Sequence, residues 1–328
     1  MTNILVTGGA GYIGSHTAKA LAAAGFTPVV LDDLSHGHRW AARWGPLVEA
    51  DVGDPVAMRA ALATHKPEAV IHFAGEISVG ESMENPGKYF RSNFCNTIVL
   101  LDAMQAAGVQ TLVYSSTAAV YGTPIKTPIA EDHPLAPINP YGESKLFSEQ
   151  AMARFADAHG LKWNALRYFN AAGADDIGDI GEDHDPETHL VPLVIDAALG
   201  RRPHIAVFGT DYATPDGTAI RDYIHVSDLA DAHVAAVRRL AGGAASGAVN
   251  VGTGRGYSVR EVIAAVERVS GRAVPVQTGP RRAGDPPVLV ADPHKARDAL
   301  GWSARRGLDE IVASALKWHM CALSKAAQ

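Results

Sequence analysis

Residues 7–14 read Thr-Gly-Gly-Ala-Gly-Tyr-Ile-Gly and directly follow a short apolar run, Asn3–Val6. Helix-forming residues predominate from Ser15 to Ala24, and Gly25 stands where that helix is expected to end. The three segments predict a strand, a tight turn and a helix. Ligands of open α/β sheets bind where strands end and helices begin, so this stretch decides the fold class.

The glycines of this turn follow a dinucleotide-binding pattern. Gly9, Gly11 and Gly14 have G-x-G-x-x-G spacing, and Gly8, Gly11 and Gly14 fit the variant with two residues between successive glycines. Glycine is needed because the turn requires unusual backbone angles, and because a side chain would keep a pyrophosphate away from the positive helix N-terminus. The strand before the turn and the helix after it favour a nucleotide site over a simple turn.

An acidic residue downstream indicates which nucleotide is bound. Asp32 ends the next apolar run, where its carboxylate can accept hydrogen bonds from an adenosine ribose. A 2'-phosphate at that position would meet like charge, which favours NAD over NADP. Arg39 and Arg43 follow closely, so NADP stays open at this point.

The rest of the chain alternates strand and helix patterns and then changes character. This alternation predicts an α/β fold, a Rossmann-type doubly wound parallel sheet with right-handed crossovers. We expect residues 1–170 to form the NAD-binding domain and the loop-rich residues 171–328 to form a smaller substrate-binding lobe. The runs at 221–225 and 250–252 read as strand ends, so late segments are expected to return to the first sheet. The expected strands are 28–31, 69–73 and 111–114, and the expected helices are 55–64, 92–107, 191–199 and 228–240.

Tyr141 and Lys145 carry the clearest sign of chemistry. They are four residues apart, so on a helix they lie on one face. Thr117 closes a strand whose carboxyl end lies on the ligand-binding edge. A phenol has a pKa near ~10 and needs neighbouring positive charge to act as a base. These residues predict oxidation of a secondary alcohol, with Tyr141 taking a proton and Thr117 orienting the hydroxyl.

Composition excludes several classes of protein. The chain has 328 residues, with 29 Lys plus Arg against 35 Asp plus Glu, and contains no long basic run, so no nucleic-acid partner is expected. No stretch of 18 apolar residues and no signal-peptide pattern is found, so we expect no membrane association and a cytoplasmic location. His36, His38, His184 and His189 occur near Asp183 and Asp185 without helical ligand spacing. We expect solvated histidines there and no metal site.

The glycine pattern together with Tyr141 and Lys145 resembles the extended short-chain dehydrogenase/reductase superfamily, over nearly the whole chain. Within it, Phe-Gly-Thr-Asp-Tyr-Ala-Thr-Pro-Asp-Gly-Thr at 208–218 and Arg-Asp-Tyr-Ile-His-Val at 221–226 resemble the signature of UDP-glucose 4-epimerases. The resemblance implies that NAD is contacted by Gly8, Gly11, Tyr12, Ile13, Gly14, Asp32, Asp33, Leu34, His36, Gly37, Asp51, Val52, Phe73, Ala74, Gly75, Ser92, Ser115, Ser116, Tyr141, Lys145 and Phe169. It implies that a UDP-sugar is held by Thr117, Asn170, His189, Leu190, Phe208, Arg221, Tyr223, Arg282 and Asp285.

The resemblance further implies a redox-neutral reaction and a homodimer. Tyr141 would remove the 4-hydroxyl proton, NAD would hold the hydride, and the 4-keto sugar would turn before the hydride returns. Dimer contact is expected through the helices near 92–107 and 141–159. Ser92 and His189 stand where relatives often have asparagine.

Three alternatives are weighed against this prediction. A 4-epimerase of another UDP-sugar, such as an N-acetylated one, fits the same residues. A 4,6-dehydratase would need an acid pair after Thr117, but Ala118 and Ala119 follow. A non-catalytic NAD-sensing protein would have no need for Thr117, Tyr141 and Lys145 together.

Overall fold

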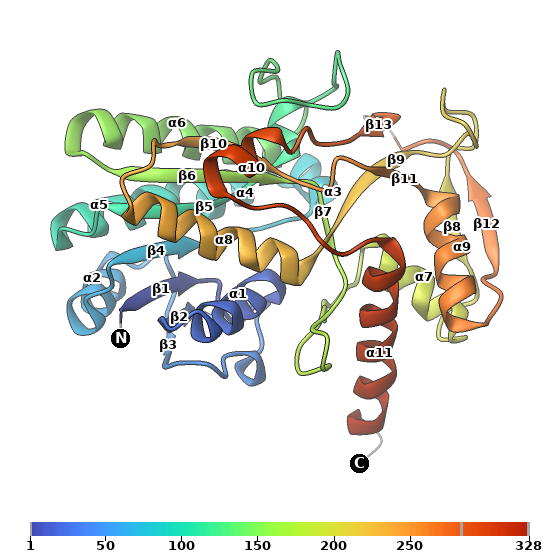
Figure 1. Ribbon diagram of the computed structural model, residues 1–328, viewed down its shortest axis with the longest axis horizontal. Coiled ribbons are helices and arrows are strands. Elements are labelled where there is room, and N and C mark those ends of the chain that lie inside the picture. The colour runs from blue at the N-terminus through green and yellow to red at the C-terminus, as the bar shows by residue number, and fades with distance from the viewer. Residues whose placement is uncertain (1, 283–284, 327–328) are drawn as a thin grey trace.

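A seven-stranded parallel sheet forms the centre of the computed structural model, which describes residues 2–282 and 285–326 (Figure 1). Every neighbouring pair of strands in it is parallel, as expected when helices cross over between strands. The predicted Rossmann-type fold is confirmed. In sheet order, the strands are β10 (Gly247–Val251), β6 (Lys162–Tyr168), β5 (Thr111–Thr117), β4 (Ala69–His72), β1 (Asn3–Thr7), β2 (Thr27–Asp32) and β3 (Leu47–Glu49).

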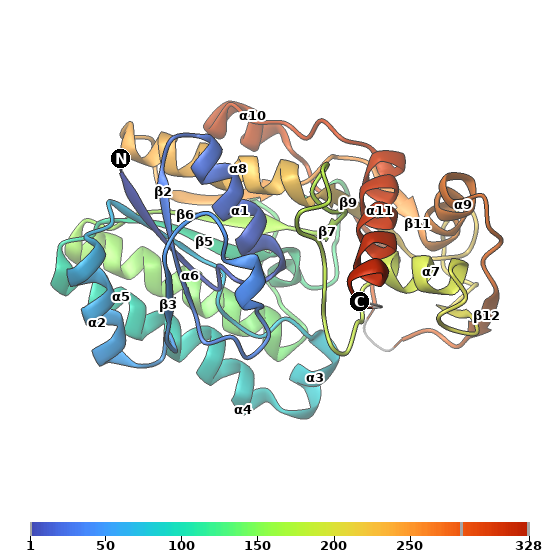
Figure 2. The same ribbon diagram turned by 90° about the horizontal axis from the view of Figure 1, so that it is seen from below.

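Helices cover both faces of this sheet and bury its apolar side chains (Figure 2). One layer contains α1 (Tyr12–Ala23), α8 (Val226–Ala241) and α10 (His294–Leu300), whose apolar residues share a core with β1, β4 and β10. The other layer contains α2 (Pro55–His65), α5 (Asn96–Ala107) and α6 (Pro140–His159), which pack on the opposite face. Both faces of the sheet are therefore buried, which explains why its strands are continuous apolar runs in the sequence.

Local sequence explains where the catalytic helix α6 begins and ends. The Asn139 side chain accepts a 2.8 Å hydrogen bond from the Gly142 amide, and Pro140 occupies the first turn, where its missing N–H costs nothing. Gly160 ends the helix with a φ of 73°, in the left-handed region. The cap fixes the orientation of Tyr141, one residue inside the helix.

Most segments after β6 build a smaller lobe beside the carboxyl ends of the main strands, whereas α8, β10 and α10 belong to the main layers (Figure 1). One small sheet joins β7 (Asn170–Ala172), β9 (Ile220–His225), β11 (Gly256–Ser258) and β13 (Val288–Leu289), and a second pairs β8 (Ile205–Phe208) with β12 (Val276–Gly279). Helices α7 (Leu190–Ala198), α9 (Val259–Ser270) and α11 (Leu308–Ala326) pack around a core of their own. The expected strand at 221–225 thus lies in this lobe, whereas β10 lies at the edge of the main sheet.

The segment between β4 and α5 differs most from the expected helix at 92–107. It forms α3 (Val79–Glu84), α4 (Pro86–Tyr89) and a π-helical turn η2 (Phe90–Cys95), and regular α-helix begins only at Asn96. Short π segments occur often at functional sites. The turn carries Asn93, which lies at the candidate site described below. The remaining short helices are η1 (Arg39–Ala41) and η3 (Ala118–Tyr121).

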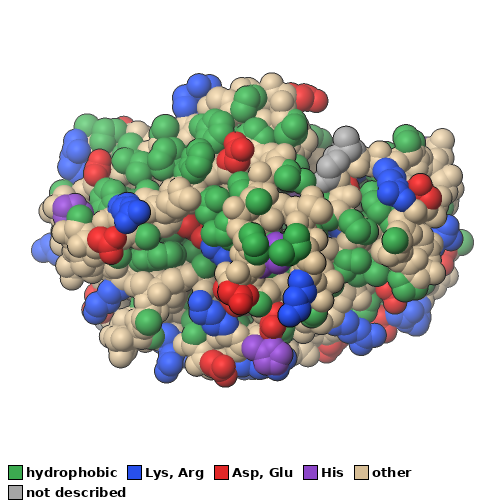
Figure 3. All heavy atoms as spheres, turned by 90° about the horizontal axis from the view of Figure 1, so that it is seen from above, with side chains coloured by type: hydrophobic (Ala, Val, Ile, Leu, Met, Phe, Trp, Pro, Cys, Tyr) green, Lys and Arg blue, Asp and Glu red, His purple; other side chains and the backbone are tan. Residues whose placement is uncertain are grey.

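Acidic and basic side chains are interspersed over the face drawn in Figure 3. Of the helices within residues 2–282 and 285–326, none has the length and apolar character needed to cross a bilayer.

Candidate active site

The turn after β1 is built so that two of its glycines cannot be replaced without moving backbone. Gly8 has a φ of 68°, and a Cβ there would lie 2.6 Å from the Ala74 amide nitrogen. A Cβ on Gly14 would lie 2.1 Å from the Gly8 carbonyl oxygen. The glycines therefore let α1 start directly against the ends of β1 and β4.

The same turn leaves the N-terminus of α1 open at Gly11. Gly11 is the N-cap residue and provides no side-chain cap, and a Cβ there would contact only the Gly8 oxygen, at 3.4 Å. The first amides of α1, from Tyr12 and Ile13, are thus free of a capping side chain. An uncapped N-terminus with room beside its glycine fits a pyrophosphate.

Asp32 is the last residue of β2, and its side chain stabilises the turn after β1. Its Oδ2 accepts a hydrogen bond from the Ala10 amide and its Oδ1 accepts one from the Leu34 amide, both at 2.9 Å. Burial raises the pKa of this carboxyl. Each carboxylate oxygen has a second lone pair, so Asp32 retains acceptor capacity for a ribose while supporting the turn.

The residues after Asp32 form a tight loop. Asp33 is exposed and accepts hydrogen bonds from the Ser35 amide and hydroxyl, at 2.9 and 2.6 Å, so its side chain forms a local turn. A Cβ on Gly37 would lie 2.7 Å from Asp32 Oδ1, which places Gly37 directly beside the acid. Leu34 has a φ of 61° and His36 is largely exposed.

Two further expected cofactor segments lie at the ends of β3 and β4. Asp51 is exposed and accepts a 2.7 Å hydrogen bond from the Gly53 amide, whereas Val52 is buried in the core. The Phe73 and Ala74 amides donate to the Thr7 carbonyl at 2.9 and 3.2 Å, so these residues abut the phosphate turn.

Asn93 is a site residue that the sequence argument missed. It is buried, its Oδ1 accepts from the Glu76 amide at 2.7 Å, and its Nδ2 donates to the Glu76 carbonyl at 3.1 Å and to Ser144 Oγ at 3.1 Å. A Cβ on Gly75 would lie 2.6 Å from Asn93 Oδ1. Asn93 therefore joins the loop after β4 to α6, while its expected neighbour Ser92 is half-buried.

Tyr141, Lys145 and Thr117 meet at the carboxyl end of β5. The Tyr141 hydroxyl lies near the Thr117 side chain, close enough for Thr117 to lower its pKa. Lys145 Nζ donates to the Ser115 carbonyl at 3.1 Å and lies 5.0 Å above the Tyr114 ring. The three residues expected to act together are thus brought into one site by β5 and α6.

Burial perturbs both titratable groups of this site. The pKa of Tyr141 is raised by loss of solvent, and the Thr117 side chain acts in the opposite direction. Burial lowers the pKa of Lys145 to about 8, because the ammonium is removed from water. Strongly perturbed groups in one cluster are typical of active sites.

The two serines before Thr117 point to opposite sides of the sheet, as alternation along a strand requires. Ser115 hydrogen-bonds to the Tyr168 hydroxyl, whereas Ser116 Oγ donates to buried Glu149 at 2.5 Å. Glu149 also pairs with Arg167. The Ser116 side chain therefore takes part in a buried network, and its contact with NAD stays a prediction.

The expected sugar-nucleotide residues gather where the chain passes from β6 to the small lobe. Asn170 stands opposite Tyr223 in the pairing of β7 with β9. Arg221, two residues earlier in β9, forms an ion pair with Asp285. Phe169 packs against a hydrophobic cluster that contains Tyr121. This cluster includes residues that directly follow Thr117 in the chain. Asn170, Arg221 and Asp285 therefore lie together in the lobe, and their contact with a sugar nucleotide stays a prediction.

A second arginine, Arg282, lies on the surface of the small lobe. The Arg282 guanidinium stacks 4.2 Å from the Phe208 ring centroid, and both side chains are exposed. This pairing offers a flat surface and a positive charge together, which suits a base or a phosphate.

His189 and its surroundings differ from the solvated histidines that were expected. His189 Nδ1 lies 2.7 Å from a Glu182 oxygen and 3.2 Å from a Glu187 oxygen. The His184 side chain is only 20% exposed and faces the same two glutamates. The expectation of a solvated His184 is wrong, because most of its side chain is covered. The acids beside it are Glu182 and Glu187 rather than Asp183 and Asp185. Leu190 follows directly as the first residue of α7.

Known proteins match both the sequence and this architecture. The profile described as "NAD dependent epimerase/dehydratase family" matches residues 4–252. The chain belongs to this family. Among its curated relatives, the "UDP-glucose 4-epimerase" of Rhizobium leguminosarum bv. trifolii is 54% identical, over 96% of this chain and 97% of that one.

Solved structures of this epimerase/dehydratase family agree closely with the fold. The UDP-glucose 4-epimerase of Brucella ovis in complex with NAD has a TM-score of 0.95 and 52% identity, covering 96% of this chain and 98% of that one. The enzyme of Bifidobacterium longum in complex with NAD+ and UDP has a TM-score of 0.93 and 40% identity, covering 98% of each chain. The resemblance inferred from the motifs is thereby confirmed.

Proposed function

We propose that this protein is a UDP-glucose 4-epimerase, an isomerase that interconverts UDP-galactose and UDP-glucose with NAD as its cofactor. The observation that carries this conclusion is the meeting of Thr117, Tyr141 and Lys145 beside an uncapped, glycine-lined helix N-terminus. Relatives of nearly equal length bear the same name. NAD fits the turn described above, and when bound it supplies a hydride acceptor for the sugar C4.

Tyr141 acts as the proton acceptor for the 4-hydroxyl. Its hydroxyl lies near the Thr117 side chain, so a substrate hydroxyl held by Thr117 would meet the phenol. Lys145 lies one helical turn further on, and its positive charge favours the phenolate. Once the 4-keto sugar has turned, Tyr141 returns the proton to the opposite epimer.

Arg221, Arg282 and Asp285 hold the nucleotide end of the substrate. Guanidinium groups bind diphosphates by paired hydrogen bonds, and Asp285 keeps the Arg221 group in place. Anchoring at the diphosphate leaves the sugar free to rotate, which epimerisation requires. Asn170 and Tyr223, which are opposite each other in the pairing of β7 with β9, are expected to contact the same substrate.

We expect kcat to fall as pH rises through about 8, the pKa to which burial lowers Lys145. Below that pH the ammonium is charged and stabilises the phenolate, and above it the charge is lost. The effect on stability has the opposite sign. Between about 8 and the unfolded value of 10.5 the unfolded chain binds more protons, so the cost of burying Lys145 diminishes as pH rises. Initial rates across this range test the expectation, and a flat profile would contradict it.

The function is tested by incubating the purified protein with UDP-galactose and no added cofactor. UDP-glucose should form without added cofactor, because NAD is retained and regenerated. The product ratio should approach the same equilibrium from either sugar, because the reaction is reversible. Chromatography of the sugar nucleotides measures both. Absence of conversion even with added NAD would contradict the assignment, and faster turnover of an N-acetylated UDP-sugar would favour that alternative substrate.

An NAD-sensing protein without activity is distinguished by the same mixture. A sensor would bind NAD without reducing it, whereas an epimerase produces a fraction of reduced cofactor that is visible in the near ultraviolet. The buried Tyr141 and Lys145 favour the enzyme, since a sensor does not require their perturbed pKa values.

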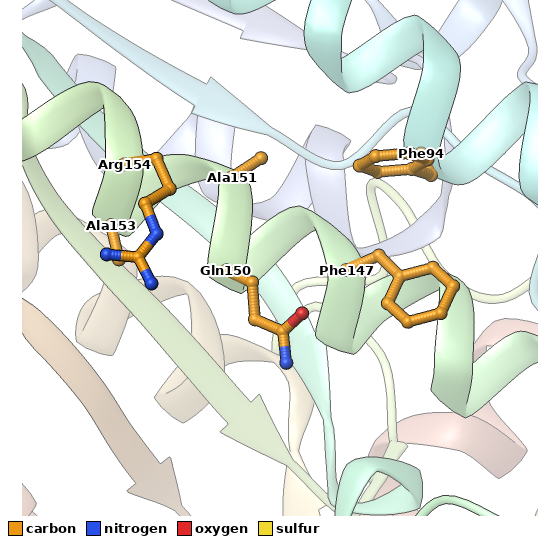
Figure 4. Close-up of a pocket in the computed structure, with 6 residues that line it drawn as sticks. All are labelled: Phe94, Phe147, Gln150, Ala151, Ala153 and Arg154. Carbon is orange, nitrogen blue, oxygen red and sulfur yellow. The ribbon is translucent and has the colours of Figure 1, made fainter. Parts of the chain in front are cut away.

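We further infer a homodimer, within the cytoplasm, that forms through α6 and the helical segment at 92–107. An apolar hollow there is lined by Phe94 and by Phe147, Gln150, Ala151, Ala153 and Arg154 of α6 (Figure 4). Phe147 is 40% exposed and contacts the rings of Phe90 and Phe94, with centroids 6.0 and 5.8 Å apart. A partly exposed aromatic cluster shared by η2 and α6 favours helix packing against a second copy.

A further inference from the structure

The loop between β7 and α7 brings two Glu-x-His units together. Glu182 and His184 form the first, and Glu187 and His189 form the second. One ligand atom from each of the four residues lies within 4.8 Å of the others. The loop runs beside α11, where the yellow-green ribbon passes the C-terminal helix (Figures 1 and 2).

Two polar atoms at the centre of this cluster make no well-aligned hydrogen bond with the described residues. They are Glu182 Oε1 and His184 Nδ1, although Glu182 Oε1 lies 2.7 Å from His189 Nδ1 and 3.3 Å from His184 Nδ1. The Glu182 side chain is only 3% exposed, so its carboxylate cannot turn to water instead. Close approach of buried polar atoms without aligned hydrogen bonds is uncommon. The arrangement therefore favours a ligand that the four groups share.

Both His184 separations from the carboxylate oxygens fall within the edge lengths of a metal coordination shell, and both His189 separations are shorter. From His184 Nδ1 they are 3.3 Å to Glu182 and 3.6 Å to Glu187, and from His189 Nδ1 they are 2.7 and 3.2 Å to the same residues. Zinc bonds of about 2.0–2.2 Å in a tetrahedron give edges of roughly 3.3–3.6 Å. A charge-assisted hydrogen bond would instead be about 2.7–2.9 Å, which only the His189–Glu182 contact meets.

The chemistry of the four groups suits a metal ion. When the two imidazoles release their protons to bind a metal, they and the two carboxylates carry a net charge of about −2, which a divalent ion neutralises. Mixed nitrogen and oxygen donors in tetrahedral arrangement favour zinc over magnesium or calcium, which require more oxygens. Glu187 is already oriented, since its Oε1 accepts from the Thr188 and His189 amides at 2.7 and 2.8 Å.

We propose that Glu182, His184, Glu187 and His189 form a structural binding site for one divalent transition-metal ion of the zinc class. The four residues lie within eight consecutive positions of one loop, so one ion would bind four ligands that are close together in the sequence. The site supplies all four ligands from the protein, as structural zinc sites do.

Its position indicates what the ion stabilises. Tyr12 of the phosphate turn packs its ring edge-on against His184, with centroids 6.2 Å apart, and its hydroxyl donates to the Gly173 carbonyl at 2.6 Å. Trp318 of α11 donates to the Glu182 carbonyl at 2.9 Å. His189 precedes α7. The ion thus fixes the loop that links the phosphate turn with the substrate lobe.

The test is metal binding by the full-length protein after dialysis against a chelator. We expect one equivalent of zinc by elemental analysis after adding ZnCl2 and desalting. Zinc at a hundredfold excess over its Kd should raise Tm by about 5 °C. Cobalt(II) in its place should show the visible absorption of a tetrahedral complex. Glu182→Gln and His184→Asn should abolish all three results.

Asp183→Asn is the matched control. Asp183 lies between two proposed ligands but faces His38 on the surface, 3.4 Å away, so this variant should bind zinc as the wild type does. The proposal is overturned if wild type takes up no zinc and shows no Tm shift, which would leave a cluster neutralised by protons. It is equally overturned if Glu182→Gln or His184→Asn binds zinc normally, because the ion would then lie elsewhere.

Discussion

Tyr141→Phe is expected to lower kcat by about 10³-fold while NAD remains bound. Loss of a positioned general acid–base group typically costs 10²–10⁴-fold. The substitution removes one oxygen, which lies near Thr117, and leaves the ring in its edge-on contact with Tyr89. The fold and the NAD site should therefore persist. Conversion of UDP-galactose is measured alongside NAD released on denaturation.

Tyr257→Phe is the control for this change. Tyr257 is a buried tyrosine of β11 whose ring lies 4.9 Å from the Arg255 guanidinium, within the small lobe. We expect this variant to keep the wild-type rate within about twofold. A Tyr141→Phe rate within tenfold of wild type would show that another group accepts the proton.

Gly14→Ala is expected to lower the free energy of unfolding by about 3 kcal/mol and to yield protein without NAD. Overpacking typically costs 1–3 kcal/mol, occasionally more. Here the new methyl group would lie 2.1 Å from the Gly8 carbonyl oxygen and 2.8 Å from the Gly9 Cα, both backbone atoms of the phosphate turn. Relief requires the turn to move, and the amides at the start of α1 would move with it. Denaturant titration and the NAD content of the purified protein measure the two effects.

Gly87→Ala provides the comparison. This glycine lies in α4, and a Cβ there would meet only the end of the flexible Arg91 side chain, at 3.2 Å. Alanine favours helix by about 1 kcal/mol over glycine, so this variant should be as stable as wild type or slightly more so. If both variants retain NAD and stability, the close contact at Gly14 has been relieved by small shifts and the turn is less constrained than the structure indicates.

Local patterns in the sequence were sufficient for the main sheet and the core of the site. The glycine turn, Asp32 and the Tyr141–Lys145 pair depend on residues close together in the chain, and each lies where its pattern predicted. Helix α1 begins at Tyr12 rather than Ser15, since the turn itself contributes the first helical residues.

Features that depend on distant contacts could not be read in the same way. Asn93 faces the site because a π-helical turn widens the helix around it, and no residue pattern signals that turn. Ser116 was grouped with Ser115, although only the tertiary pairing with Glu149 reveals which side chain faces inward. Glu182 and Glu187 were overlooked because their proximity to two histidines arises from the folding of an irregular loop.

The path of the chain also limits how such an enzyme changes during evolution. Strand β10 and helices α8 and α10 lie between segments of the small lobe in sequence, yet they complete the layers of the main sheet. A recombination event that exchanged everything after β6 as one cassette would replace an edge strand and two covering helices of the nucleotide-binding half as well. New sugar preferences are therefore more accessible through substitutions within the loops and short strands of the lobe than through exchange of whole segments between genes.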